Sequence, residues 1–96
     1  MRPSKALATC REQVLSIAAA HGVSSVRVFG SVVKGSDADG SDLDLLVDVP
    51  PGASLFDLAR LQMEIETLLG IKVDLRTEGE LHSRIRPRVL AEARLV

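Results

Sequence analysis

The chain contains no tryptophan and no tyrosine, and phenylalanine occurs only twice, at Phe29 and Phe56. Proteins that bind single-stranded nucleic acid commonly stack bases on aromatic side chains, and this chain has few to offer. Its formal net charge of -1 also provides no basic surface for a duplex. We therefore expect no nucleic acid as a direct ligand.

Cysteine and long apolar runs are equally scarce. Cys10 is the only cysteine, which excludes an internal disulfide and is typical of a reducing compartment. No apolar run approaches the roughly 20 residues that span a bilayer, and the first residues lack the apolar core of a signal peptide. We expect a single cytoplasmic domain over residues 1–96, with no membrane association.

Apolar residues recur at two periods along the chain. Helical spacing predicts helices over 4–21, over 54–70 and, with an interruption near Pro87, from about Glu80 onward. Alternation predicts strands over 26–29, 42–49 and 71–76. A whole helix between the last two strands favours a parallel pair. The pattern therefore predicts an α/β fold with a small mixed sheet and helices packed on one face.

Three aspartates fall on the other face of this predicted sheet. Asp42 and Asp44 are two residues apart, so both point the same way from one strand, and Asp74 occupies the polar side of the next. Ionised carboxylates that meet alone repel one another. Hard oxygen ligands suit Mg²⁺ or Mn²⁺, and a pair of such ions stabilises displacement at phosphorus. The three acids are therefore candidate ligands for two metal ions.

A glycine-rich turn precedes the acids. Gly30 follows the first strand and would let the backbone approach a bulky anion. Ser31 would open a helical turn and offer its hydroxyl and N–H to a phosphate. Lys34 lies one turn later and would neutralise phosphate charge, and Gly35 would end the turn. The segment therefore predicts a site for a triphosphate beside the acids.

At this point the sequence resembles a known superfamily, the polymerase-beta-like nucleotidyltransferases, and within it the minimal nucleotidyltransferases, the MNT group. The resemblance rests on Gly30-Ser31, on Lys34-Gly35, on the run from Ser41 to Val47 and on Asp74, and it covers nearly the whole chain. Lys34 stands where the family more often has arginine, so the charge is kept but the bidentate fork is lost.

The resemblance implies transfer of a nucleoside monophosphate, typically AMP from ATP, to a hydroxyl. It implies that Asp42 and Asp44 bind both metals and that Asp74 binds one and helps to deprotonate the acceptor. Gly30, Ser31, Lys34 and Ser41 would contact the nucleotide phosphates. Many MNT proteins are antitoxins that modify a tyrosine of a HEPN-domain toxin and also bind it, so the resemblance implies such a partner.

Other functions stay open at this point. The chain could neutralise a partner by binding alone, or it could modify a hydroxyl of a small molecule. The apolar side of the last helix would serve a homo-oligomer and a different partner equally well. A solvated strand face is the plain alternative for Asp42 and Asp44 alone, but the upstream turn and Asp74 together favour the metal site.

The remaining polar residues suggest structural roles. We expect Asp37 and Asp39 to be solvated loop acids, Asp48 to lie on the surface or form a salt bridge, Cys10 to belong to the core, and His82 to lie on the surface. A calcium-binding EF-hand loop starting at Asp37 would need glycine at its sixth position, which is Asp42. A Walker-type phosphate loop is excluded because Gly35 is followed by serine and not by lysine.

Overall fold

The computed structural model describes all 96 residues. Its elements follow in the order α1 (Pro3–Thr9), α2 (Arg11–Ala20), β1 (Ser25–Phe29), α3 (Ser31–Lys34), β2 (Leu43–Asp48), α4 (Leu55–Leu69), β3 (Val73–Arg76), a 3-10 turn η1 (Glu78–Glu80), α5 (Arg86–Glu92) and β4 (Arg94–Leu95). No helix is both long and apolar enough to cross a lipid bilayer.

The four strands form one mixed sheet in the order β3-β2-β1-β4. β1 is antiparallel to β2 and β4, whereas β2 and β3 are parallel and are joined by α4. The predicted mixed sheet and its parallel pair are therefore confirmed. Alternation does not predict β4, because its two residues are too few to show a period.

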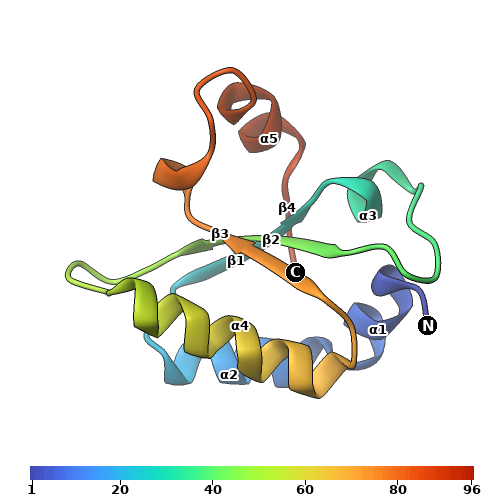
Figure 1. Cartoon of the computed structure of the whole chain (residues 1–96), viewed down its shortest axis with the longest axis horizontal. Helices are drawn as coiled ribbons and strands as arrows, with labels where there is room; N and C mark the ends of the chain where they lie inside the picture. The colour runs from blue at the N-terminus through green and yellow to red at the C-terminus, as the bar shows by residue number, and fades with distance from the viewer.

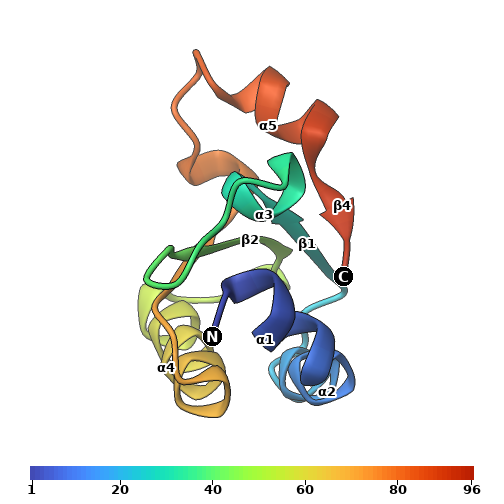
Figure 2. The same cartoon turned by 90° about the vertical axis from the view of Figure 1, so that its right-hand side faces the viewer.

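The main core lies between the sheet and the layer formed by α1, α2 and α4, which cover one face (Figures 1 and 2). Burying each large apolar side chain contributes about 1.5–3 kcal/mol, and the alternation of β2 directs its apolar residues to this face. The core residues are Leu7, Val14, Ala18, Val23, Val26, Val28, Leu43, Leu45, Val47, Leu61, Ile65, Val73 and Leu75.

Helix α4, which joins the parallel strands, is closed at both ends as its sequence predicts. The Ser54 hydroxyl accepts a hydrogen bond from the Asp57 N–H at 3.2 Å, and the Asp57 carboxylate accepts one from the Ser54 N–H at 2.8 Å. This reciprocal pair satisfies two backbone donors that the first turn of a helix leaves free. Gly70 ends the helix in the left-handed conformation, with φ +68°.

The first helix differs from the prediction, because residues 4–21 form two helices and not one. The break lies at Cys10, whose φ of -111° and ψ of 20° are not helical. Just before it, the Thr9 hydroxyl donates to the Lys5 carbonyl at 2.9 Å, a bond of the kind that often bends helices. The expectation that Cys10 belongs to the core is therefore wrong; it is partly exposed at the junction.

The C-terminal segment, residues 78–92 with η1 and α5, lies on the opposite face of the sheet (Figure 2). Leu46 points to that face and packs with Leu81 and Val89 in a small second core, against which Phe29 and Leu90 also lie. The fold therefore adds a cover on the second face to the helical layer predicted on the first. Leu46 is the reason, since it is the one apolar side chain among the acids of its strand.

Candidate active site

Three side chains lie in one row across the sheet. Phe29 on β1 is the register partner of Asp44 on β2, and Asp44 is the register partner of Asp74 on β3. Directly opposite residues in a sheet point to the same face, here the face that α2 and α4 leave uncovered. The structure thus brings Asp44 and Asp74 together, as the strand alternation predicts.

Gly30 stands directly against Asp44. A Cβ atom at this position would overlap Oδ2 of Asp44 and would lie 3.1 Å from its Cγ. The backbone of Gly30 also has φ +72° and ψ -144°, a conformation that is open mainly to glycine. The close approach and the backbone conformation both require glycine here, and together they place the turn beside the acid.

The turn itself forms as the sequence predicts. Ser31 begins the short helix α3, Lys34 ends it, and the Lys34 N–H donates to the Gly30 carbonyl at 3.1 Å. Gly35 closes the turn in the left-handed conformation. Ser31 is half-buried, whereas Lys34 is exposed and forms no ion pair with a carboxylate of the chain. The Lys34 ammonium is therefore free to meet an anion from solvent.

The electrostatics of the row centre on Asp44. Burial raises the pKa of Asp44 above its usual value, and the negative charges of Asp74 and Asp42 raise it further, while Arg76 acts in the opposite direction. The negative charge of ionised Asp44 is thus only partly compensated by the positive charge of Arg76. A divalent cation would supply that charge, and carboxylate oxygens are the ligands that Mg²⁺ and Mn²⁺ prefer. The donor set therefore fits such a metal.

The other two acids have cationic neighbours. Asp74 accepts a hydrogen bond from Arg76 Nε at 3.0 Å, and Asp42 lies 4.0 Å from Lys72 Nζ. As placed, no three His, Cys, Asp or Glu side chains converge closely enough to hold a metal ion. A metal bound by all three acids would require the Asp74 carboxylate to turn from Arg76 towards Asp44. Both side chains have that freedom, because each is more than a third exposed.

Ser41 lies outside this row. Its hydroxyl accepts a hydrogen bond from the Ala38 N–H at 2.9 Å, and its N–H donates to the Ala38 carbonyl at 3.0 Å. Its contacts thus shape the loop that leads into Asp42.

The expectation that Asp37 is a solvated loop residue is wrong. Only 5% of Asp37 is exposed, and its carboxylate accepts hydrogen bonds from the Ser4 N–H at 2.9 Å and from the Arg2 guanidinium at 3.2 Å. The Arg2 Nε also donates to the Asp37 carbonyl at 3.1 Å. These bonds, with Ser4 foremost, lower the pKa of Asp37. They fasten the loop between turn and acids to the start of α1.

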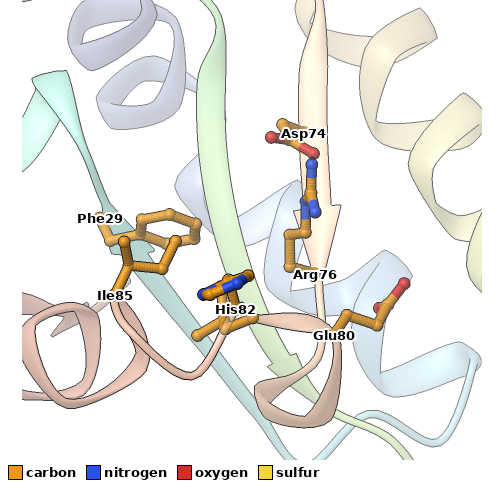
Figure 3. A pocket seen from close by; sticks show the side chains of 7 residues that line it. Phe29, Asp74, Arg76, Glu80, His82 and Ile85 are labelled. Atoms are coloured by element: carbon orange, nitrogen blue, oxygen red, sulfur yellow. The ribbon is translucent and has the colours of Figure 1, made fainter.

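A cavity of about 320 Å³ adjoins Asp74 and involves residues that the sequence analysis does not assign to the site (Figure 3). It lies between Phe29 on β1, Arg76 on β3 and the C-terminal segment. Arg76 follows Asp74 by two residues, so strand alternation could have placed it on the same face. His82 is exposed, as expected, yet it also lines this cavity, and its Nδ1 accepts a hydrogen bond from the Arg84 N–H at 3.1 Å.

Comparison with known sequences bears on this arrangement. The chain matches the family described as nucleotidyltransferase domain over residues 7–96. It is 39% identical over 89 residues to the protein adenylyltransferase MntA of Thermococcus cleftensis, a match that covers 84% of this chain and 90% of the relative. It is 37% identical over 83 residues to a candidate protein adenylyltransferase of Methanocaldococcus jannaschii, with coverage of 86% and 89%.

Comparison with solved structures gives the same result. The chain superposes on a candidate minimal nucleotidyltransferase with a TM-score of 0.85 and 47% identity, covering 97% of this chain and 95% of that one. A mutant of the toxin–antitoxin pair MntA-HpeT matches with a TM-score of 0.70, covering 90% and 69%, but its 14% identity shows the fold alone. This chain therefore belongs to the nucleotidyltransferase domain family, as its resemblance to the minimal nucleotidyltransferases implies.

Proposed function

We propose that the protein transfers AMP from ATP to a hydroxyl group of a partner protein in a reaction that depends on a divalent metal. The observation that carries this proposal is the position of Asp44, between the glycine of the turn at Gly30 and the acid at Asp74. An anion held at the turn would have its phosphates next to the two acids. The relatives named as protein adenylyltransferases support AMP as the transferred group.

The turn would hold the β- and γ-phosphates of the nucleotide. The N–H of Ser31 and its hydroxyl would donate to phosphate oxygens, and the Lys34 ammonium would neutralise their charge. Asp42, Asp44 and Asp74 would hold Mg²⁺, with Mn²⁺ as a substitute. When bound, two such ions stabilise the attacking and the leaving oxygen of an in-line displacement.

Asp74 would act on the acceptor. Its carboxylate would take the proton of the acceptor hydroxyl, whose oxygen would form a bond to the α-phosphorus of ATP. The bond between the α-phosphorus and the bridging oxygen to the β-phosphorus would break, and pyrophosphate would leave. Arg76 would have to release Asp74 before this proton transfer, since its Nε now occupies one carboxylate oxygen.

For the acceptor we propose a tyrosine of a HEPN-domain toxin, which makes the protein an antitoxin. The resemblance to the MNT group supports this partner, and the MntA-HpeT structure is described as a toxin–antitoxin pair. The same fold would bind that partner whether or not it modifies it, so catalysis has to be tested separately from neutralisation.

The experiment uses ATP labelled at the α-phosphate, Mg²⁺ and the protein encoded beside this one in its genome. We expect label on the partner, loss of transfer with EDTA, and loss of transfer in Asp42→Ala and Asp44→Ala. Asp48→Ala is the matched control, because Asp48 is an exposed acid on the same strand face. Neutralisation of the partner without any transfer by the wild-type protein would identify a binding module instead.

A further inference from the structure

The outer side of α4 carries apolar side chains that nothing in the chain covers. Leu55 is 76% exposed, Phe56 82% and Met63 64%, so one helix holds three of the six large apolar side chains that the chain leaves exposed. Ala59 is exposed between them. Residues three, four or seven apart lie on the same side of a helix. These four residues therefore form one continuous apolar surface, which we call the α4 stripe.

The other three sides of α4 are engaged within the chain. Ile65 is fully buried and packs in the main core beneath the sheet. On one flank the Glu66 carboxylate accepts a hydrogen bond from the N–H of Val73 on β3 at 2.9 Å. On the other flank Glu64 pairs with His21, which follows the end of α2. The α4 stripe is the fourth side, opposite the core, and it points to solvent from the outside of the helical layer (Figure 2).

The same helix closes the edge of the sheet next to it. β3 is an edge strand, and free N–H groups on such a strand can pair with another chain. Here the N–H groups of Val73 and Leu75 donate instead to the Glu66 carboxylate and to the Gln62 side-chain oxygen, at 2.9 and 3.4 Å. A second molecule therefore finds little to pair with along β3, whereas the α4 stripe beside it stays open.

The α4 stripe and the acids lie on opposite sides of the sheet. α1, α2 and α4 cover one face, and Asp44 and Asp74 lie on the other (Figures 1 and 2). A protein that brings a hydroxyl to Asp74 would approach from the face of the acids and would leave the α4 stripe uncovered. The molecule that covers the stripe is therefore a different one from the acceptor.

The order of residues along the stripe fits a second copy of the same helix. Phe56 and Met63 are two turns apart, and Ala59 lies between them. In an antiparallel pair of α4 helices with the two-fold axis beside Ala59, Phe56 of each copy would meet Met63 of the other. Contacts between a thioether sulfur and an aromatic ring are favourable. The small side chain of Ala59 would let the two helices approach closely.

The charges beside the stripe are also complementary to themselves. Arg60 lies on the same flank as Asp57 and Glu64 and forms no ion pair within the chain. In an antiparallel pair the same flank of both helices meets, so each Arg60 would lie between Asp57 and Glu64 of the other copy. The Asp57 carboxylate is held by the cap of α4, and Glu64 by His21. Both acids are therefore already positioned to receive the arginine.

The size of the stripe agrees with that of a stable interface. Its three large side chains expose roughly 400–500 Å². A standard interface covers about 800 Å² of each partner, and about 57% of that area is non-polar. The apolar part of such an interface is thus roughly 450 Å² on each copy, which the α4 stripe can supply alone.

We propose that the protein forms a homodimer in which the α4 stripes of two copies pack antiparallel. The two faces that carry Asp44 and Asp74 would then point away from each other, and both would stay open to ATP and to an acceptor. This inference does not depend on the transferase function. It assigns the contact to α4 and not to the last helix, because Val89 and Leu90 of that helix pack within the chain.

Sedimentation equilibrium over a series of protein concentrations tests the dimer. We expect the wild type to approach twice the chain mass of 10.3 kDa, with a Kd in the micromolar range or tighter. Phe56→Asp should stay monomeric, because it places a charge in the interface, while an acid in the first turn is compatible with the helix. Leu95→Asp is the matched control, since Leu95 is 75% exposed on β4 and should leave the dimer intact. A monomeric wild type, or assembly beyond two copies, would overturn the proposal.

A charge exchange tests the antiparallel arrangement. Arg60→Glu and Glu64→Lys should each weaken the dimer roughly 10-fold, because each removes two symmetric ion pairs and adds like charges. An equal mixture of the two variants should restore association, since each copy then meets the opposite charge. Weakening that the mixture does not repair would contradict this arrangement.

Fluorine NMR locates the contact and tests the other occupant. Phe29 and Phe56 are the only phenylalanines, so fluorophenylalanine gives one signal from each side of the sheet. The Phe56 signal should shift as the protein concentration rises, and the Phe29 signal should stay constant; the reverse would place the contact on the face of the acids and reject our proposal. A wild type that is monomeric alone, with Phe56→Asp losing affinity for the protein encoded beside it, would assign the stripe to that partner and equally reject the homodimer.

Discussion

The α-carbon of Gly30 faces the carboxylate of Asp44 with no room for a methyl group between them. The two residues come from the separate motifs that the sequence suggests for phosphate and for metal, and the antiparallel pairing of β1 with β2 brings them into contact. Any substitution at Gly30 must therefore displace the acid, strain the backbone, or do both.

We predict that Gly30→Ala abolishes AMP transfer while the protein still folds. The positive φ alone costs about 1–3 kcal/mol of stability, the overlap with Asp44 adds to this cost, and the displaced carboxylate loses its place in the row. Gly35→Ala is the matched control, since Gly35 also has φ +72° but nothing lies within 4 Å of the added Cβ. Equal activity losses in the two variants would show that the backbone conformation, and not the contact with Asp44, is what matters.

We predict that Asp74→Asn lowers turnover by about 10²–10⁴-fold, because on the proposed mechanism it removes the group that would accept the proton and one group that would bind the metal. Circular dichroism and the melting temperature should stay close to those of the wild type, since Asp74 lies partly exposed on the sheet. Asp48→Asn changes the same chemical group on the same face and should retain activity. Wild-type turnover in Asp74→Asn would contradict the role of this acid.

We predict that Asp37→Asn destabilises the protein at neutral pH but not in acid. The pKa of Asp37 is lowered in the folded state by its bonds to Ser4 and Arg2. The stabilisation is therefore complete above the unfolded value of about 3.9 and is lost as the pH falls through the lower folded value. Urea unfolding of the wild type and of Asp37→Asn across this pH range checks the direction of the effect. A difference between their free energies of unfolding that widens in acid would contradict the prediction.

The control for this variant is Asp39→Asn. Asp39 lies in the same loop and pairs with the amino group of Met1 at 3.1 Å, but 81% of its side chain is exposed. Exposed ion pairs contribute at most about 1 kcal/mol, so we expect little change in stability at any pH.

We predict that Val89→Ala loosens the C-terminal segment without unfolding the sheet. Only Leu46, Leu81 and Val89 are fully buried in the second core, so the segment should open at a lower free energy than the main core. In hydrogen exchange the amides of α5 should lose protection in this variant while those of β2 keep it. Val14→Ala, in the main core, should instead lower protection throughout.

Local periodicity predicts most of the fold, because β1 and β3 alternate between buried and more exposed residues, β2 departs from this alternation only at Leu46, and α4 carries its own caps. The row of Asp44 and Asp74 follows from alternation combined with a parallel pair. The docking of the C-terminal segment does have a signal in the sequence, because Leu46 interrupts a strand face otherwise made of Asp42, Asp44 and Asp48. An apolar residue among acids predicts that something covers it.

Other features had no local signal. Asp37 and Arg2 are 35 residues apart, and nothing in either neighbourhood distinguishes a partly buried ion pair from two solvated charges. The engagement of Asp74 by Arg76 depends on side-chain rotamers that spacing alone does not fix. The cavity at Phe29 exists only because η1 and α5 return over the sheet, a tertiary event that no short pattern encodes.

Through the bonds from Arg2 and Ser4 to Asp37, the start of the first helix holds in place the loop that leads into Asp42. On the proposed function, this support would make nucleotide affinity depend on a region outside the proposed phosphate site. Shortening or redirecting α1 would remove these bonds and let the loop shift, and the proposed nucleotide site would then bind ATP less tightly although none of its own residues had changed.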